Sequence, residues 1–218
     1  MINFIAGEAG IKTSAFIGIL FAFAATCLVM WKGMGMLPRD QGREFAVDGK
    51  KSAGKPRGAG FLFVLVFIAA ALLFGQVGRE MIIYLILTGA AMITGFLDDC
   101  AKTPWGEYKK GFLDLLIAVM VAVTFLNFNS NEVTILLTGA SFTIPPILFG
   151  LLVVVLVWVS INVTNCSDGV DGLCASLCVI VMLSFGLIFK ETLGTYVIAN
   201  FLFAAVLLAY LYFNSSPS

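Results

Sequence analysis

The hydrophobic positions of this chain fall into long runs, separated by shorter polar segments that carry most of the charges. Seven runs approach or reach the length of about 20 apolar residues that a helix needs to cross a bilayer. They cover approximately residues 11–31, 58–77, 81–97, 111–127, 146–161, 173–189 and 193–213. The pattern predicts an all-α, polytopic integral membrane protein, with about seven transmembrane helices in a single domain, residues 1–218.

The composition agrees with this prediction. The chain is 60% hydrophobic and 12% charged, and its mean hydropathy of +1.02 is typical of a membrane protein. The first apolar run lacks the small-residue cleavage site of a signal peptide, so we interpret it as a membrane helix. A β-branched run, 133–135, and a turn signal at Gly139 predict a short hairpin within residues 128–145. The formal net charge of zero gives no reason to expect a nucleic-acid partner.

Basic residues are concentrated in alternate connections between the apolar runs. The first connection carries seven of them and the third carries three, whereas the connections on the other side and the N-terminal segment carry Lys12, Arg79 and Lys190. Because cytoplasmic loops of membrane proteins are enriched in Lys and Arg, we predict cytoplasmic loops near 32–57, 98–110, 162–172 and 214–218. The N-terminus and the hairpin would then lie on the outer, periplasmic side.

Polar side chains interrupt the apolar pattern most sharply after the fifth run. Amide and carboxylate side chains recur there at every third position: Asn162, Asn165, Asp168 and Asp171. A charged group at the centre of a bilayer costs about 2.5–3.5 kcal/mol or more, so this segment belongs at a water boundary. Gly169 and Gly172 suit a backbone that turns sharply or approaches a ligand.

Two adjacent aspartates, Asp98 and Asp99, end the third run, and Lys102 follows one helical turn later. Adjacent carboxylates repel each other unless they share a cation, and Mg²⁺ binds through one or two carboxylates together with substrate phosphates. The alternative interpretation is a solvated helix end. Two acidic pairs at the same membrane face, beside basic loops, favour a surface that holds a metal ion and a diphosphate.

Three segments of the chain resemble motifs of a known enzyme family. They are LPRDQGRE with the downstream GKPRGAG, GFLDDCAK at 95–102, and NVTNCSDGVDGL at 162–173. On these segments the chain resembles the polyprenyl-phosphate sugar-1-phosphate transferases, and within them the bacterial phospho-N-acetylmuramoyl-pentapeptide transferases. The resemblance implies a membrane fold of about ten helices, of which this chain would contain seven.

The resemblance also implies an activity at the cytoplasmic face of the bacterial inner (plasma) membrane. Phospho-MurNAc-pentapeptide would pass from UDP-MurNAc-pentapeptide to undecaprenyl phosphate, giving lipid I and UMP in peptidoglycan synthesis, with Mg²⁺ as the cofactor. Asp98, Asp99 and Asp168 would be catalytic, the first two as metal ligands. The expected substrate-binding residues are Asn162, Asn165, Asp171, Lys102, Lys109, Lys110 and Lys51.

The chain departs from the family pattern in two places. Lys55, Pro56 and Arg57 stand where the family usually has Thr-Pro-Thr, and the sequence stops at Ser218, where the family continues into a further aspartate motif and a histidine-rich loop. We therefore expect these 218 residues to lack the C-terminal third of such an enzyme, and to lack transferase activity by themselves.

Two alternatives stay open. One is a polyprenyl-phosphate GlcNAc-1-phosphate transferase, since the donor sugar cannot be deduced from these motifs. The other is a membrane transporter, although transport sites usually lie near the bilayer midplane and often within inverted repeats, whereas the acids of this chain gather at one face. A homodimer is compatible with the sequence, which does not determine the oligomeric state.

Overall fold

A computed structural model of the chain describes residues 7–39, 54–101, 103, 105–135, 137–167 and 170–215. The long helices are α2 (Gly7–Gly33), α3 (Ala59–Phe74), α4 (Arg79–Cys100), α5 (Glu107–Phe128), α6 (Pro146–Ser167), α7 (Leu173–Ile188) and α9 (Val197–Asn214). Short helical turns form η1 (Met34–Met36), α8 (Lys190–Leu193) and η3 (Gly194–Tyr196), and the strands are β1 (Glu132–Ile135) and β2 (Ala140–Thr143).

These helices confirm an all-α, polytopic membrane protein. Within the described residues, five helices are long and apolar enough to cross a membrane: α2, α4, α5, α6 and α9. The other two, α3 and α7, have 16 residues each, which corresponds to about 24 Å of helix against a hydrocarbon core of about 30 Å. Each coincides with a predicted apolar run, but the number of spans stays a prediction.

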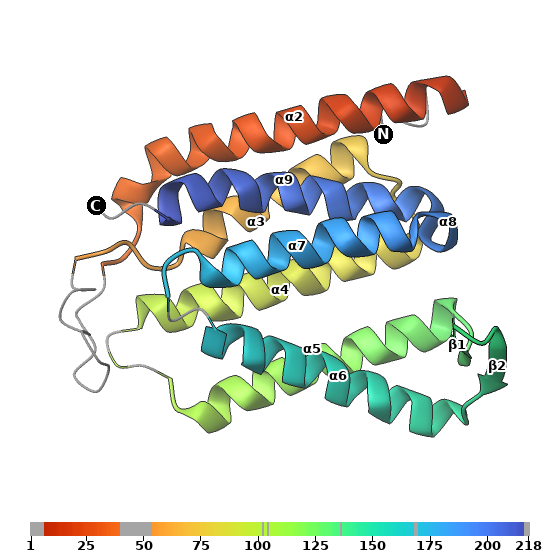
Figure 1. Cartoon of the computed structure of the whole chain (residues 1–218). Coiled ribbons are helices and arrows are strands. Elements are labelled where there is room, and N and C mark those ends of the chain that lie inside the picture. The colour runs from red at the N-terminus through yellow and green to blue at the C-terminus, as the bar shows by residue number, and fades with distance from the viewer. Residues whose placement is uncertain are drawn as a thin grey trace.

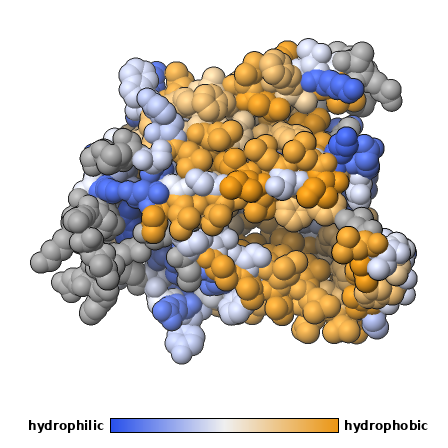
Figure 2. Space-filling view, viewed as in Figure 1, coloured by the Kyte–Doolittle hydropathy of each residue, from blue (hydrophilic) through white to orange (hydrophobic). Residues whose placement is uncertain are grey.

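The long helices run side by side, and their connections gather at two opposite ends (Figure 1). At one end, which we call the loop end, α2, α4, α6 and α9 finish and α3, α5 and α7 begin. The opposite end, which we call the hairpin end, carries β1, β2 and α8. Figure 2 shows a broad apolar surface along the helices, with the hydrophilic side chains gathered at both ends. This distribution suits a bundle that spans a bilayer.

The core of the bundle lies where α2 and α3 pack against α9. Every fourth residue of α2 is buried along one face: Ser14, Gly18, Ala22, Thr26 and Met30. Because most of these side chains are small, the backbones can approach closely, as in membrane helix pairs generally. Thr26 donates a hydrogen bond to the Ala22 carbonyl oxygen four residues earlier, so its hydroxyl is satisfied within the helix. On α9, Leu202 and Val206 are fully buried against this face.

The predicted hairpin is confirmed. Strands β1 and β2 pair antiparallel, with Glu132 opposite Thr143 and Ile135 opposite Ala140. Gly139 has a φ of 68° in the turn, a conformation that favours glycine. The side of the membrane on which the hairpin lies stays a prediction.

One predicted helix boundary was wrong. The fifth apolar run was expected to end at Ile161, with a loop over 162–172, but α6 continues to Ser167. Asn162 lies inside this extension, where its side-chain amide donates to the Trp158 carbonyl oxygen at 2.8 Å. The helix extends beyond the apolar run because its backbone hydrogen bonds can form in water as well as in lipid. Apolar side chains are needed only inside the membrane.

Candidate active site

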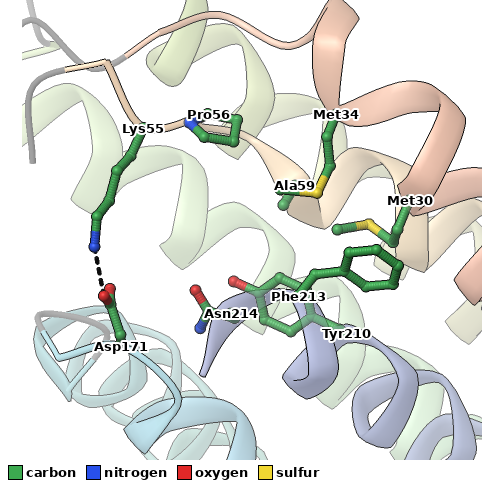
Figure 3. Close-up of a pocket in the computed structure, with 9 residues that line it drawn as sticks. All are labelled: Met30, Met34, Lys55, Pro56, Ala59, Asp171, Tyr210, Phe213 and Asn214. Carbon is green, nitrogen blue, oxygen red and sulfur yellow. Dashed lines mark hydrogen bonds and ion pairs between the residues drawn. The ribbon is translucent and has the colours of Figure 1, made fainter. Parts of the chain in front are cut away.

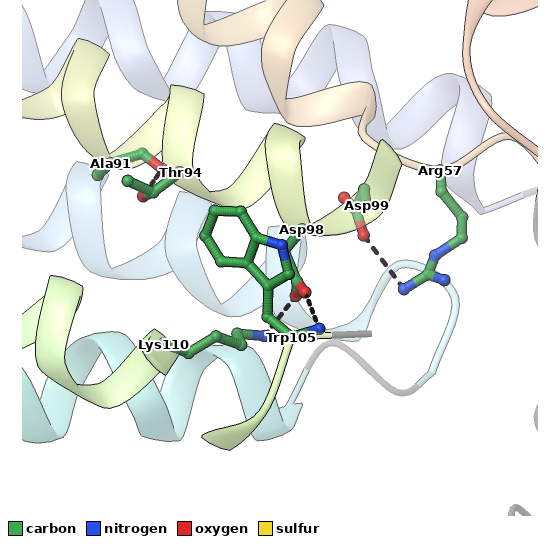
Figure 4. Close-up of polar contacts among 7 residues, drawn as sticks. All are labelled: Arg57, Ala91, Thr94, Asp98, Asp99, Trp105 and Lys110. Atoms are coloured by element: carbon green, nitrogen blue, oxygen red, sulfur yellow. Dashed lines mark hydrogen bonds and ion pairs between the residues drawn. The ribbon is translucent and has the colours of Figure 1, made fainter. Parts of the chain in front are cut away.

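Asp98 lies in the last turn of α4, where two groups from the following segment meet its carboxylate. The Trp105 backbone N–H donates to Oδ1 at 2.9 Å, and the Lys110 Nζ lies 3.0 Å from Oδ2 (Figure 4). The Asp98 side chain is only 14% exposed. Its two partners therefore supply the polar contacts that water would otherwise make with the carboxylate. Asp98 thus binds the Trp105 backbone just before α5 and holds Lys110 at the loop end.

Asp99 has a different partner, which comes from the first connection. The Arg57 Nη2 lies 3.1 Å from the Asp99 Oδ1 (Figure 4). Arg57 is positioned by Gly58, which precedes α3 with a φ of 74°. A Cβ at position 58 would lie 2.8 Å from the Phe96 ring and 3.6 Å from the Asp99 Oδ2. Glycine therefore lets the first connection approach the aspartate pair closely.

The second acidic segment connects α6 to α7 at the same end of the bundle. Asn162 and Asn165 lie in the last turns of α6, and Asp171 lies just before α7. Gly172 starts α7 with a φ of 76°, so this glycine allows the sharp turn that the sequence predicted. The Asp171 Oδ2 pairs with the Lys55 Nζ at 2.5 Å.

Lys55 and Arg57 bring the two acidic segments together. They are two residues apart, and two residues of extended chain span at most about 7 Å. One binds Asp171 and the other binds Asp99. The α4 and α6–α7 motifs therefore face the same short stretch of backbone, as expected from the sequence for a shared site.

A pocket of about 90 Å³ adjoins the Lys55–Asp171 ion pair (Figure 3). Its other walls come from the end of α2, η1, the connection before α3, the start of α3 and the end of α9, and are mostly apolar. They comprise Met30, Met34, Pro56, Ala59, Tyr210, Phe213 and Asn214. The ion pair therefore closes one side of an amphipathic hollow at the loop end.

The structure describes two of the four lysines that were predicted to bind substrate. Lys110 lies on Asp98, and the Lys109 Nζ lies 3.4 Å from the centre of the Trp105 ring, a cation–π contact. Asp168, Lys102 and Lys51 lie outside the described residues. Sequence reasoning did not assign Lys55, Arg57 or Trp105 to the site. A signal existed for the first two, because a basic segment flanked by Gly54 and Gly58 indicates either a phosphate-facing segment or a basic loop at anionic lipid.

The donor set at the end of α4 fits a hard divalent cation. Asp98 and Asp99 present carboxylate oxygens, the ligands that Mg²⁺ prefers, next to cations that could bind phosphate. No cluster of three or more His, Cys, Asp or Glu side chains suited to a metal ion occurs in the described part of the chain. A cation at this pair would therefore need further ligands, such as substrate phosphates.

Comparison with known proteins agrees with this geometry. Residues 81–218, which include both acidic segments, match the model of glycosyl transferase family 4. The chain belongs to this family. This finding confirms the membership expected from the sequence motifs.

Several similar curated proteins share the name phospho-N-acetylmuramoyl-pentapeptide-transferase. The relative from Treponema pallidum (strain Nichols) is 37% identical over 93% of this chain and 61% of its own length. The relative from Symbiobacterium thermophilum is 30% identical over 80% of this chain and 57% of its own length. In Gloeothece citriformis the identity is 28% over 84% of this chain. The chain thus spans about three fifths of the length of the Treponema pallidum relative.

Proposed function

We propose that this chain forms the metal and nucleotide side of a phospho-N-acetylmuramoyl-pentapeptide transferase site. The reaction would transfer phospho-MurNAc-pentapeptide from its UDP carrier to undecaprenyl phosphate, with lipid I and UMP as products. The observation that carries the proposal is the aspartate pair at the end of an apolar helix, faced by cations from two other segments. The shared name of the relatives supports the choice of substrate.

The proposed chemistry is a displacement at phosphorus. An oxygen of the lipid phosphate attacks the sugar-linked phosphorus of the donor; a P–O bond forms there as the P–O bond to UMP breaks, and the electron pair leaves with UMP. The lipid phosphate is already a nucleophilic anion, so the site mainly has to align two anions and neutralise their charge. Mg²⁺, when bound, would supply part of that neutralisation.

Residue roles follow from this scheme. Asp98 and Asp99 would hold Mg²⁺, and the two lysines at the start of α5, Lys109 and Lys110, would lie within reach of phosphate oxygens. Asn165 and Asp171 would orient the nucleotide, and Asp168 would be the further essential acid. We propose that the loop end faces the cytoplasm, where nucleotide sugars are made, and that the N-terminus of α2 lies outside.

The test is UMP release by the complete gene product in native membranes supplied with undecaprenyl phosphate, UDP-MurNAc-pentapeptide and Mg²⁺. We expect Asp98→Asn and Asp99→Asn each to lower turnover by a factor of at least about 100, because each removes charge from the reacting centre. Glu107→Gln is a matched control, since Glu107 is exposed in the first turn of α5 and should leave turnover within about twofold.

Two further arms separate the alternatives. UDP-GlcNAc in place of UDP-MurNAc-pentapeptide tests the GlcNAc-1-phosphate transferase, and chelation of divalent cations tests the requirement for Mg²⁺. Turnover with UDP-GlcNAc alone would reject the proposed donor. Undiminished turnover in both aspartate variants would reject the proposed site.

A further inference from the structure

The segment Lys55–Arg57 crosses the loop end between the two acidic motifs. Its two cations meet two carboxylates that come from different helices, Asp171 before α7 and Asp99 at the end of α4. Figures 3 and 4 show each side chain extended toward its partner. The ion pairs join parts of the chain that are far apart in sequence; Lys55 and Asp171 are separated by 116 residues.

The backbone of this segment is held by the chain that leaves α2. The Arg57 N–H donates to the Pro38 carbonyl oxygen at 2.8 Å, and the Arg39 Nη1 donates to the Gly54 carbonyl oxygen at 2.9 Å. Arg39 and Pro56 also pair as an isolated antiparallel bridge. In such extended backbone, alternate side chains point the same way. The two cations are therefore presented together by backbone that has its own anchors.

The ion pairs themselves are weakly held. The Lys55 and Asp171 side chains are 43% and 54% exposed, and Arg57 and Asp99 are 34% and 29% exposed. Ion pairs in contact with water contribute little, because both charges keep much of their hydration. A divalent metal ion that binds Asp99 directly can therefore displace the Arg57 side chain at low cost. The backbone anchors would keep the displaced side chain nearby.

The proposed substrate would bring the missing counter-charges. A nucleotide diphosphate with Mg²⁺ would bring a cation for Asp99, O–H and N–H donors for Asp171, and anionic oxygens for Lys55 and Arg57. Guanidinium and ammonium groups both bind phosphate oxygens strongly, the former through its planar fork. Each charge in the site would thus exchange one partner for another, and none would be left unpaired.

We propose that Lys55 and Arg57 are diphosphate-binding residues that neutralise Asp171 and Asp99 until a divalent cation and the nucleotide arrive. The inference rests on the proposed function and extends it to two residues at which this chain differs from the family's usual Thr-Pro-Thr. It requires that Arg57 compete with the metal ion for Asp99, and that both Lys55 and Arg57 strengthen nucleotide binding. Loss of the Arg57 charge should therefore tighten metal binding and weaken nucleotide binding.

The test uses two probes, Mn²⁺ alone and UDP with Mg²⁺, on the purified complete gene product in detergent. Arg57→Gln should bind Mn²⁺ about threefold more tightly, because a weak competing ion pair is removed. The same variant should bind UDP about tenfold more weakly, because a charge-assisted hydrogen bond is lost. Lys55→Gln should also weaken UDP binding but leave the Mn²⁺ affinity within about twofold, because its partner Asp171 is not a proposed metal ligand. Arg57→Lys should restore part of the UDP affinity.

Lys32→Gln is the matched control. It removes one positive charge from the last turn of α2, at the same end of the bundle and at an exposed position, so both affinities should stay within about twofold. Elution profile and helical circular dichroism verify that each variant is folded.

The outcomes separate the inference from the function on which it rests. If the parent protein binds neither probe, both are rejected. If the parent binds both probes but Arg57→Gln binds Mn²⁺ more weakly, the arginine supports the carboxylates without competing for them, and the inference alone is rejected. An unchanged UDP affinity in both Arg57→Gln and Lys55→Gln rejects it as well.

Discussion

The helices of this chain form two groups that differ in how they are packed. In the first group, α2, α3, α7 and α9 share an interior, and 39% of the α9 span is buried within the protein. In the second group, α5 and α6 pack mainly on each other, α4 links them to the rest, and 0% of the α6 span is buried. Figure 1 shows the α5–α6 pair lying below the other helices.

The candidate site joins these two groups. Asp99 and Asp171 are bound by the first connection, which belongs to the packed group, whereas Asp98 is bound by Lys110 of α5. The aspartate pair therefore stands at the border, with one carboxylate facing each group. Polar contacts to both groups therefore hold the acidic side chains of the site.

One such contact lies between α5 and α6. The Trp158 Nε1 donates to the Gly111 carbonyl oxygen at 2.9 Å. Gly111 follows Lys110 directly, and the Trp158 carbonyl oxygen accepts from Asn162. The Trp158 indole thus links α6, which carries Asn162 and Asn165, to the first turn of α5, which carries Lys110.

The largest effect should come from the core of the packed group. Leu202 of α9 is 0% exposed, so Leu202→Ala should lower the free energy of unfolding by about 2–5 kcal/mol, through lost contacts and a cavity. Leu151→Ala on α6, where the side chain is 61% exposed, should change it by less than about 0.5 kcal/mol. Unfolding in mixed detergent micelles, followed by circular dichroism, measures both. Equal losses would remove the distinction between the groups.

An intermediate effect is expected where α2 meets α3 and α9. A Cβ at Gly18 would lie 2.7 Å from the Phe74 Cβ and 3.2 Å from the Leu202 Cδ2. Gly18→Ala should therefore cost about 1–3 kcal/mol in the same unfolding assay, because the helices must separate to admit the methyl group.

Gly95→Ala on α4 is the matched control for this substitution. An added Cβ there meets no described atom within 4 Å. Because alanine is the better helix former by up to about 1 kcal/mol, the change should be neutral or slightly stabilising. Destabilisation of similar size at both glycines would contradict close packing as the cause.

The helices and the hairpin could be predicted from the sequence, whereas the difference in packing between the two groups of helices could not. The apolar runs predicted every long helix because each is bounded by charges or turn residues, and the turn signal at Gly139 predicted the hairpin. The runs do not distinguish a buried apolar helix from an exposed one, since in a membrane both are apolar. The difference between α9 and α6 was therefore not predictable from hydrophobicity.

In the candidate site, the acidic side chains could be predicted from the sequence, but the residues that bind them could not. Asp98 and Asp99 were predicted because a pair of carboxylates at the end of an apolar helix is costly without a cation. Their partners were not predicted: Lys102 seemed nearest by helical spacing, but the described partners are Lys110 and Arg57. Pairings between distant segments depend on how the loops fold back, which local spacing does not encode.

The smallest effect should come from the Trp158–Gly111 link within the α5–α6 pair. Trp158→Phe keeps an aromatic ring but removes the donor to Gly111, and interhelical hydrogen bonds in membranes contribute on average about 0.6 kcal/mol. The unfolding free energy should fall by about that amount. Trp31→Phe on α2, where the indole is 73% exposed, should leave it unchanged. Because α6 packs on little besides α5, we also expect spin labels at Tyr108 and Thr164 to show a broader distance distribution in Trp158→Phe. An unaltered distribution would mean that the α5–α6 interface holds the asparagines in place without the indole.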